Sequence, residues 1–438
     1  MGESLNVVIV GAGPSGLFAA NELADQFDVT VIEERGFVGG SGLLSDGKLN
    51  FHPLIGGDLT EFLPDMEAWD LVFRIKDVFS SLGVEEKEQN RKGMEDLNIK
   101  TAKAGFRFVK ILQNHIGSDY LPGVIRRFRK GLEGRGVRFM LGTRAIDVSV
   151  DAGRATGVLT EDGVVEADEV ILVPGRVGSR WLMGLMGRLG VELEYNPIDV
   201  GVRVEVPNEV LNDITNGFNI WDPKFHIYTP SYDDFVRTFC VCPHGYVVRE
   251  TYEDGLFGVN GHSMRDVGSP NTNFALLTRV GLTHPQENAA EYGRRIAQLA
   301  NTLGGKHPLI QRLGDLRGCR RSTWDRIGRS HVEPTYRDVT PGDISMAYPR
   351  RLVRDLLEGL EMLDQVIPGV NSDSTLLYGP EIKFYAMRVS TDGSLRTLIP
   401  NLYVAGDGSG VSRGIVGAAA TGVIAARGVL AGYEGAEP

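Results

Sequence analysis

Three glycines near the N-terminus, Gly11, Gly13 and Gly16, have the spacing of a phosphate-binding turn. In such a turn the first glycine permits a tight bend, the second lets the backbone approach a pyrophosphate, and the third lets helix and strand pack closely. The N-terminus of the following helix offers free N–H groups to the phosphates. Glu33, 22 residues after Gly11, is placed to accept hydrogen bonds from a ribose diol. The alternative, an ordinary glycine-rich turn, is disfavoured because the whole unit is present.

The elements that must position these residues form a β-α-β unit. Apolar runs at 7–10 and 29–32 predict two buried strands, and a helical stretch lies between them. A second glycine cluster, residues 36–51, follows and suggests backbone forced close to a ligand. The run at 169–173 predicts a further strand of the parallel sheet, with Gly175 at its carboxyl edge.

A second strand-turn-helix element closes the chain. A buried strand at 402–405 leads into Gly406-Asp407-Gly408 and then into a helix of small residues that starts near Gly414. A cofactor with two parts needs two separate binding elements, and the N-terminal and C-terminal glycine turns could supply them. Asp407 is offered to a ribityl hydroxyl or phosphate, and the helix N-terminus would favour the N1–C2=O2 edge of a flavin, which becomes anionic on reduction.

The middle of the chain has a different hydrophobic pattern from its two ends. Residues 196–348 contain alternating strand-like runs and one helix, which predicts a mainly antiparallel sheet inserted into the first domain. The expected fold is therefore α/β, with a Rossmann-like domain formed by both chain ends (1–195 and 349–438) and an inserted α+β substrate domain (196–348).

Composition restricts the class of protein. The 438 residues carry a net charge of -11, which argues against non-specific binding to nucleic acid or to an anionic membrane. Three cysteines make no disulfide framework, and a reducing, cytoplasmic setting fits them. We see no signal peptide and no run approaching the roughly 18 apolar residues of a membrane span.

Other chemistry-bearing residues have weaker patterns. Cys240-x-Cys242 could be a redox dithiol, but two cysteines on one face of a strand favour a structural role as small buried side chains. No second Cys or His pair has zinc spacing, so no metal is expected. His244 and His262 could act as acid or base, with a hydrogen-bonded or surface histidine as the default. No serine lies in a nucleophile elbow.

The sequence resembles the FAD-binding, glutathione-reductase-like flavoprotein superfamily in VVIVGAGPSGLFAA (7–20), VTVIEE (29–34) and NLYVAGDGSGVSRGIVGAAATG (401–422). It is similar, more narrowly, to a family of uncharacterised FAD-dependent dehydrogenases in GGSGLLSDGKL (39–49), IGSDYL (116–121), DVGVRVEVP (199–207), RTFCVCPHGYVV (237–248), VNGHS (259–263) and LYGPEIKFYAMRV (377–389). This resemblance implies bound FAD. We assign its contacts to Gly11, Gly13, Pro14, Ser15, Gly16, Glu33, Glu34, Arg35, Gly40, Ser41, Gly42, Arg144, Ala145, Gly175, Gly406, Asp407, Gly414, Ile415 and Val416.

The resemblance also implies where the reaction takes place. In such flavoproteins the second glycine loop lies beside the isoalloxazine, where Lys48 could contact N5 or a substrate carboxylate. Tyr385 and Arg388, with Glu381 and Lys383, precede the last strand and could line the substrate cavity. The segment 384–387 and the final turn depart from the narrow family's pattern, which suggests a substrate of its own.

These features predict an FAD-dependent oxidoreductase that transfers a hydride between a small organic substrate and flavin N5. No second G-x-G-x-x-G follows a strand, so NAD(P)H would visit the substrate face or a separate protein would supply electrons. One alternative is an NAD(P)H-dependent flavin monooxygenase. Another is a binding or scaffold protein in which FAD is structural.

Overall fold

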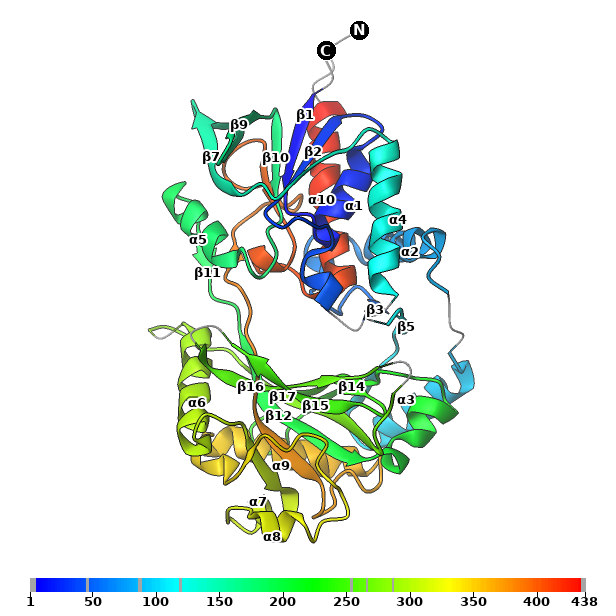
Figure 1. The fold of residues 1–438 in the computed structure, drawn as a ribbon. Helices are drawn as coiled ribbons and strands as arrows, with labels where there is room; N and C mark the ends of the chain where they lie inside the picture. Colours follow the sequence, from blue (N-terminus) through cyan, green and yellow to red (C-terminus); the bar gives the residue numbers. More distant parts are fainter. Residues whose placement is uncertain are drawn as a thin grey trace. The chain divides into compact units, whose positions relative to one another are not determined.

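The computed structural model describes residues 5–44, 47–85, 89–117, 120–252, 255–264, 267–285 and 287–434. The chain divides into two units (Figure 1). The first unit contains Met1–Lys87, Ile111–Asn196 and Ala386–Pro438, and therefore both chain ends. The second unit contains Glu88–Lys110 and Pro197–Tyr385.

A five-stranded parallel sheet is the centre of the first unit. Its order is β22-β10-β1-β2-β6, and every neighbouring pair is parallel. The strands are β1 (Asn6–Val10), β2 (Asp28–Glu33), β6 (Arg138–Leu141), β10 (Glu169–Leu172) and β22 (Leu402–Val404). This confirms the predicted Rossmann-like arrangement, in which the first and last strands of the chain share one sheet.

Alternation along these strands separates two cores. Val7, Ile9 and Val29 face helices α1 (Pro14–Leu23), α2 (Asp65–Ser81), α4 (Leu121–Gly134) and α10 (Gly414–Glu434). Val8 and Val10 face α5 (Ser179–Arg188) and an antiparallel sheet of β7 (Ala145–Asp151), β8 (Arg154–Thr160) and β9 (Gly163–Glu166). Both faces of the parallel sheet are therefore covered, as parallel sheets require. Short elements complete the unit: η1 (Gly40–Leu44), β3 (Lys48–Phe51), η2 (Leu59–Glu61), β5 (Leu112–His115), β11 (Leu193–Glu194), β21 (Arg388–Val389) and η7 (Asp407–Ser409).

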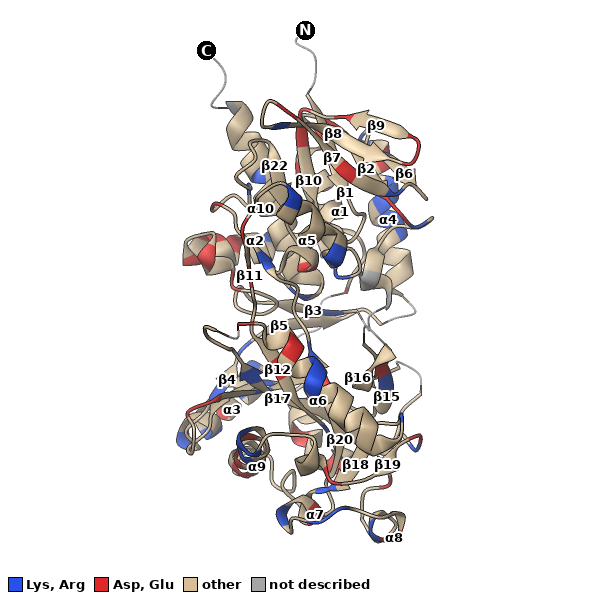
Figure 2. Ribbon diagram, turned by 90° about the vertical axis from the view of Figure 1, so that its left-hand side faces the viewer, with Lys and Arg blue, Asp and Glu red and all other residues tan. Residues whose placement is uncertain are grey.

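Helix α10 corrects one expectation about apolar runs. Its segment Gly414–Tyr433 is, among the described residues, the one helix long and apolar enough to cross a membrane, with a mean hydropathy of 1.6. The helix is drawn almost entirely tan in Figure 2, because it contains very few charged residues. However, 72% of this window is buried inside the structure, and α10 packs beside α1 (Figure 1). Its apolar character is explained by its place in the core.

An eight-stranded sheet is the centre of the second unit. Its strands, in spatial order, are β19 (Thr340–Pro341), β18 (Leu309–Arg312), β20 (Leu376–Lys383), β12 (Ile198–Pro207), β17 (Asn271–Val280), β14 (Phe235–Cys242), β13 (Lys224–Tyr228) and β4 (Arg107–Val109). All neighbours are antiparallel except β18 and β19. The predicted mainly antiparallel β domain is therefore present.

One face of this second sheet is apolar and the other is polar. Val200, Val202 and Val204 are fully buried in a core shared with α3 (Arg91–Lys103), α6 (Ala289–Gly304) and α9 (Arg350–Asp364). Alternate residues of the same strand, Arg203 among them, point to the opposite face. The remaining elements are β15 (Tyr246–Thr251), β16 (Phe257–His262), α7 (Leu313–Arg317), α8 (Trp324–Ile327), η3 (Asn208–Val210), η4 (Asp213–Gly217) and η6 (Ile344–Met346).

The predicted domain boundary at residue 349 is wrong. Helix α9 buries its apolar stripe, with Leu356 and Leu360, in the core of the second unit. Strand β20 then pairs with both β12 and β18 inside the eight-stranded sheet. The second unit therefore extends to Tyr385 and also takes 88–110, which supply α3 and the edge strand β4.

Candidate functional site

The glycines of the β1–α1 turn have different structural roles. Gly11 has a φ of +112°, and a Cβ there would lie 2.2 Å from the carbonyl oxygen of Val173. A Cβ on Gly16 would lie 1.9 Å from the carbonyl oxygen of Gly11. A Cβ on Gly13 would meet nothing within 4 Å. Gly11 and Gly16 are thus required by packing, whereas Gly13 leaves its backbone open to a ligand.

The N-terminus of α1 supplies a second feature that fits a phosphate. Its N-cap, Gly13, has no side chain to cap the first N–H groups, and Pro14 begins the helix. The hydroxyl Oγ of Ser15 is buried and has no hydrogen-bond partner among the described residues. A buried hydroxyl without a partner is costly, and a phosphate oxygen at this helix end would satisfy it. The residues present therefore fit the diphosphate of FAD.

Glu33 is fixed by the backbone around it. Its Oε2 accepts a hydrogen bond from the Ala12 N–H (2.9 Å), and its Oε1 accepts one from the Arg35 N–H (3.0 Å). Each carboxylate oxygen keeps a further lone pair. The carboxylate therefore orients the turn and can still accept a hydrogen bond from a ribose hydroxyl.

Other predicted contacts gather at the carboxyl ends of β2 and β6. Arg144 Nε lies 3.5 Å from Glu34 Oε1, and both side chains are mostly exposed. The N–H of Gly142 donates to the carbonyl oxygen of Arg35 (3.0 Å), and Ala145 begins β7. Glu34, Arg35, Arg144 and Ala145 thus lie near the end of the strand that carries Glu33, and their contacts with FAD remain predictions.

The second glycine cluster packs on the first. The N–H of Gly39 donates to the carbonyl oxygen of Ala12 (2.8 Å). A Cβ on Gly40 would lie 3.3 Å from Gly13 Cα, and one on Gly42 would lie 3.3 Å from Pro14 Cγ. Ser41 belongs to η1, but its side chain, like Ser45 and Asp46 of the same loop, lies outside the described part of the structure. The structure therefore brings Gly40 and Gly42 to the phosphate-binding turn.

The C-terminal turn forms the other half of the site. A Cβ on Gly408 would lie 2.4 Å from the carbonyl oxygen of Gly175, so the predicted residue Gly175 lies directly against this turn. Asp407 accepts hydrogen bonds from Ser412 Oγ (3.1 Å) and from the Gly414 N–H (3.3 Å) at the start of α10.

Asp407 is held in place by its surroundings. Burial raises the pKa of the Asp407 carboxyl, and the nearby Arg176 and Arg413 lower it. Its predicted contact with FAD remains a prediction. Ile415 and Val416 lie in the first turn of α10, whose other N–H groups face the same end.

Sequence reasoning missed a loop that contacts this turn. The Arg413 N–H donates to the carbonyl oxygen of Gly56 (2.7 Å), and a Cβ on Gly417 would lie 2.1 Å from that same oxygen. A Cβ on Gly57 would lie 2.9 Å from the carbonyl oxygen of Val411. The adjacent Gly56-Gly57 pair was the available signal, since two successive glycines in a loop often permit a close backbone approach.

The three predicted catalytic residues are not all in one unit. Lys48 begins β3, where it pairs with His115 of β5. Arg388 begins β21 of the same unit, where its Nη1 lies 2.5 Å from Glu61 Oε2. Tyr385 is the last residue of the second unit. The charge of Arg388 is therefore already paired, and a catalytic role for these three residues remains a prediction.

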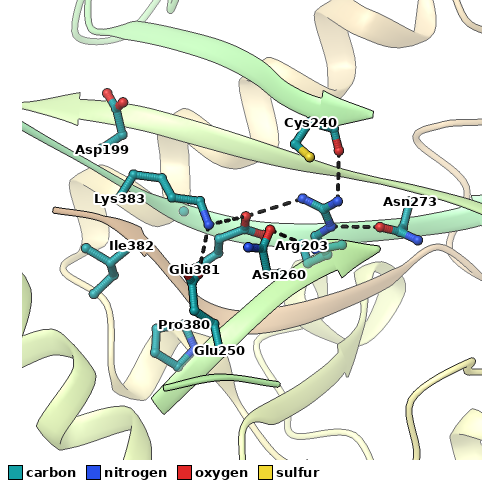
Figure 3. A network of polar contacts seen from close by, with 12 residues as sticks. Asp199, Arg203, Cys240, Glu250, Asn260, Asn273, Pro380, Glu381, Ile382 and Lys383 are labelled. Atoms are coloured by element: carbon teal, nitrogen blue, oxygen red, sulfur yellow. Dashed lines mark hydrogen bonds and ion pairs between the residues drawn. The ribbon is translucent and has the colours of Figure 1, made fainter. Parts of the chain in front are cut away.

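Glu381 and Lys383 are parts of a buried ion network in the second unit (Figure 3). Arg203 is fully buried, with Nη1 3.3 Å from Glu381 Oε1, and its Nε donates to Asn273 Oδ1 (2.8 Å). Lys383 Nζ lies 3.1 Å from Glu381 Oε1 and 2.9 Å from Glu250 Oε2. Burial raises the pKa of Glu381, and the two cations lower it.

This network corrects the expectation that Glu381 and Lys383 line a cavity. Two acids and two bases neutralise one another, and both side chains are buried within β20. Removing one member of such a buried set leaves an uncompensated charge and destabilises the fold. Both charges are thus already paired inside the second unit.

The cysteine pair and the histidines also have local partners. Cys240 Sγ and Cys242 Sγ lie 3.9 Å apart as free thiols, and Arg203 Nη2 donates to Cys242 Sγ (3.3 Å). His244 Nδ1 forms a hydrogen bond with Asn208 Nδ2 (2.7 Å). His262 lies opposite Tyr246 in the strand register at the end of the β15–β16 hairpin. The structural interpretation of Cys240-x-Cys242 stays the preferred one.

Known families match two parts of the chain. Residues 197–383 match the family described as FAD-dependent protein, C-terminal domain-like. This match covers nearly all of Pro197–Tyr385, the longer of the two segments that form the second unit. Residues 9–43 match the NAD(P)-binding Rossmann-like domain, which covers the glycine turn and Glu33.

Individual proteins are also similar in sequence. An uncharacterised protein of Clostridium beijerinckii is 27% identical over 459 residues, 98% of this chain and 81% of that protein. The thiamine thiazole synthase of Thermotoga maritima is 47% identical over 64 residues, 14% of this chain and 25% of that protein.

Solved structures are more distant. The L-proline dehydrogenase of P. horikoshii has a TM-score of 0.44 at 13% identity, covering 99% of this chain and 95% of that one, and at this distance it indicates nothing about the substrate. The family match over residues 9–43 nevertheless agrees with the glycine turn and Glu33. Together the two family matches support FAD as the cofactor of this chain and a Rossmann-like nucleotide-binding domain at its N-terminal end.

Proposed function

We propose that this protein transfers a hydride between a small organic substrate and FAD. FAD supplies the two-electron chemistry at its flavin ring, and the protein supplies binding and orientation. The Gly13 backbone, the Ser15 hydroxyl and the N-terminus of α1 would hold the diphosphate. Asp407 and the start of α10 would hold the ribityl chain and the flavin edge.

One observation carries the proposal. The two chain ends meet in one sheet, where β1 and β22 flank β10, and each ends in a glycine turn followed by a helix N-terminus. A nucleotide bound only through its ADP part would need only the first of these turns. We further propose a cytoplasmic location and, as a source of electrons, either NAD(P)H or a separate electron-transfer protein.

The test is an anaerobic titration of the purified holoprotein. Bound oxidised flavin absorbs near roughly 450 nm, and this band should disappear when a substrate or an electron donor reduces it. The donors should include NADH, NADPH and a panel of small amines, alcohols and acids. Absence of flavin from the purified protein, or a flavin that no donor reduces, would refute the proposal.

A further inference from the structure

A row of basic side chains crosses the polar face of the sheet in the second unit. Arg107 of β4 pairs with His226 of β13, and His226 pairs with Arg237 of β14. Residues directly opposite one another in an antiparallel sheet point to the same face, with their Cβ atoms about 5 Å apart. The two arginines therefore flank the His226 ring on one face of the sheet.

The adjacent row adds aromatic rings and another cation. Tyr228 pairs with Phe235, and Arg279 stacks on the Phe235 ring with Cζ 4.8 Å from its centroid. Asp199 accepts a hydrogen bond from Arg237 Nη2 (2.5 Å) and lies 3.7 Å from Arg279 Nε. The face thus combines cations with a flat apolar surface.

The acids described on this face do not balance the bases. Arg107, Arg237, Arg279 and Lys224 surround His226, and each of them lowers its pKa. Among the described residues, two carboxylates form ion pairs with these cations. Asp199 pairs with Arg237, and Asp222 Oδ2 lies 2.5 Å from Lys224 Nζ. Together with burial, the largest cause, these four cations lower the pKa of His226 to about 3. The histidine is therefore neutral at pH 7, and the face keeps an excess positive charge.

A hydrogen-bond donor on this face also lacks an acceptor. Arg237 Nε is buried and has no hydrogen-bond partner among the described residues, although Nη2 of the same guanidinium binds Asp199 and Tyr385. A buried donor without an acceptor costs about 1–3 kcal/mol. An added carboxylate would satisfy both the charge and the donor, because the guanidinium fork matches carboxylate geometry.

From these observations we propose that the basic face, formed by Arg107, His226, Arg237 and Arg279 with Tyr228 and Phe235, binds the carboxylate of a small organic acid with a flat apolar part. The cations hold the carboxylate, and the aromatic rings contact the flat part. That this acid is the substrate of the flavin reaction rests on the proposed function.

Equilibrium binding to the holoprotein tests the site without any turnover. Benzoate and 2-naphthoate should bind in a calorimetric titration, and the isosteric neutral amides, benzamide and 2-naphthamide, should not. Arg107→Gln and Arg237→Lys should each weaken benzoate binding at least tenfold. Arg107 is exposed, so its replacement leaves the fold intact. Arg295→Gln, on α6 and 72% exposed, removes the same charge away from this face and should leave binding unchanged.

The outcomes separate this site from the proposed function. Equal binding of acids and amides, or benzoate binding that Arg107→Gln and Arg237→Lys leave intact, overturns the site. If carboxylates bind as expected but no donor reduces the flavin, the site stands and the proposed function fails. If neutral donors reduce the flavin equally well in the wild type and in Arg107→Gln, hydride transfer stands and the organic acid is not its substrate.

Discussion

At the scale of single residues, the three motif glycines separate binding from folding. Gly11 and Gly16 lie against backbone carbonyl oxygens, so a side chain at either position would displace the turn itself. Gly13 has open space where its Cβ would be. The same sequence motif therefore contains two glycines required by the packing of the turn and one that leaves open space for a ligand.

Gly13→Ala should weaken FAD binding at least tenfold while leaving the apoprotein's melting temperature nearly unchanged. The added methyl group occupies the space through which a diphosphate approaches, and a tenfold change corresponds to about 1.4 kcal/mol. Gly16→Ala should instead destabilise the apoprotein, because its Cβ would lie 1.9 Å from the Gly11 oxygen. Fluorescence titration with FAD and thermal unfolding measure the two effects.

Gly131→Ala is the matched control. Gly131 lies within α4, and a Cβ there meets nothing within 4 Å. This variant should keep FAD affinity, and it should not lower stability, because alanine has the higher helix propensity. Wild-type FAD affinity in Gly13→Ala would contradict the assigned role of Gly13.

Glu169 provides a second prediction at this scale. Burial raises the pKa of its carboxyl to about 7, the neighbouring Asp168 also raises it, and Arg154 lowers it. The folded protein then binds a proton more tightly than the unfolded chain, so ionising Glu169 lowers stability as the pH rises from about 4.5 to about 7. Glu169→Gln should match the wild type at pH 5 and be more stable at pH 8, by about 1 kcal/mol after allowance for solvent screening.

Thermal unfolding of both proteins at the two pH values is the measurement. Glu161→Gln, at an exposed position in the turn after β8, controls for the loss of a glutamate and should show no such pH-dependent difference. If Glu169→Gln changes stability equally at pH 5 and pH 8, the raised pKa is not its cause.

At the scale of elements, small residues let α10 approach its neighbours closely. A Cβ on Gly422 would lie 2.1 Å from the carbonyl oxygen of Ser15 on α1, and one on Gly417 would lie 2.1 Å from that of Gly56. Helix α10, which we assign to the flavin edge, is thus packed directly on α1, which we assign to the diphosphate. The spacing between the two halves of the site depends on these glycines.

Gly422→Ala should lower the stability of the apoprotein by about 1–3 kcal/mol, the usual cost of overpacking, and should weaken FAD binding with it. Gly432→Ala lies in the same helix, where a Cβ meets nothing within 4 Å, and should instead stabilise it slightly through higher helix propensity. Denaturant unfolding of the apoproteins compares them. Equal effects of the two substitutions would show that the close approach of α1 and α10 is not needed.

The sequence allows some of these elements to be predicted better than others. The glycine turn, Glu33 and the strand before Gly406 follow from local patterns, since turn chemistry and buried runs depend on adjacent residues. The placement of α9 and β20 in the second unit does not follow from local patterns. The amphipathic pattern of a helix such as Arg350–Asp364 shows which face is buried, but it does not show which element that face packs against. The row of Arg107, His226 and Arg237 was also hidden, since it depends on the register of three strands.

At the scale of the whole molecule, the chain enters the first unit, forms most of the second, and returns to finish the first. The sheet of the first unit is complete only when β22, from the last part of the chain, pairs with β10. Both turns of the FAD site therefore depend on contacts between residues some 390 positions apart, from Gly13 to Asp407. Such non-local closure makes the cofactor site a property of the completed chain.

Hydrogen exchange on the apoprotein, with and without ligands, tests whether both glycine turns bind FAD. FAD should slow exchange in peptides covering 11–17 and also in peptides covering 406–416, because the two segments would hold its two halves. ADP carries only the diphosphate and adenosine, so it should protect 11–17 and leave 406–416 unchanged. Protection of the first segment alone by FAD would mean that the C-terminal turn takes no part in binding. Equal protection of both segments by ADP would assign Asp407 and the start of α10 to the diphosphate instead of the flavin.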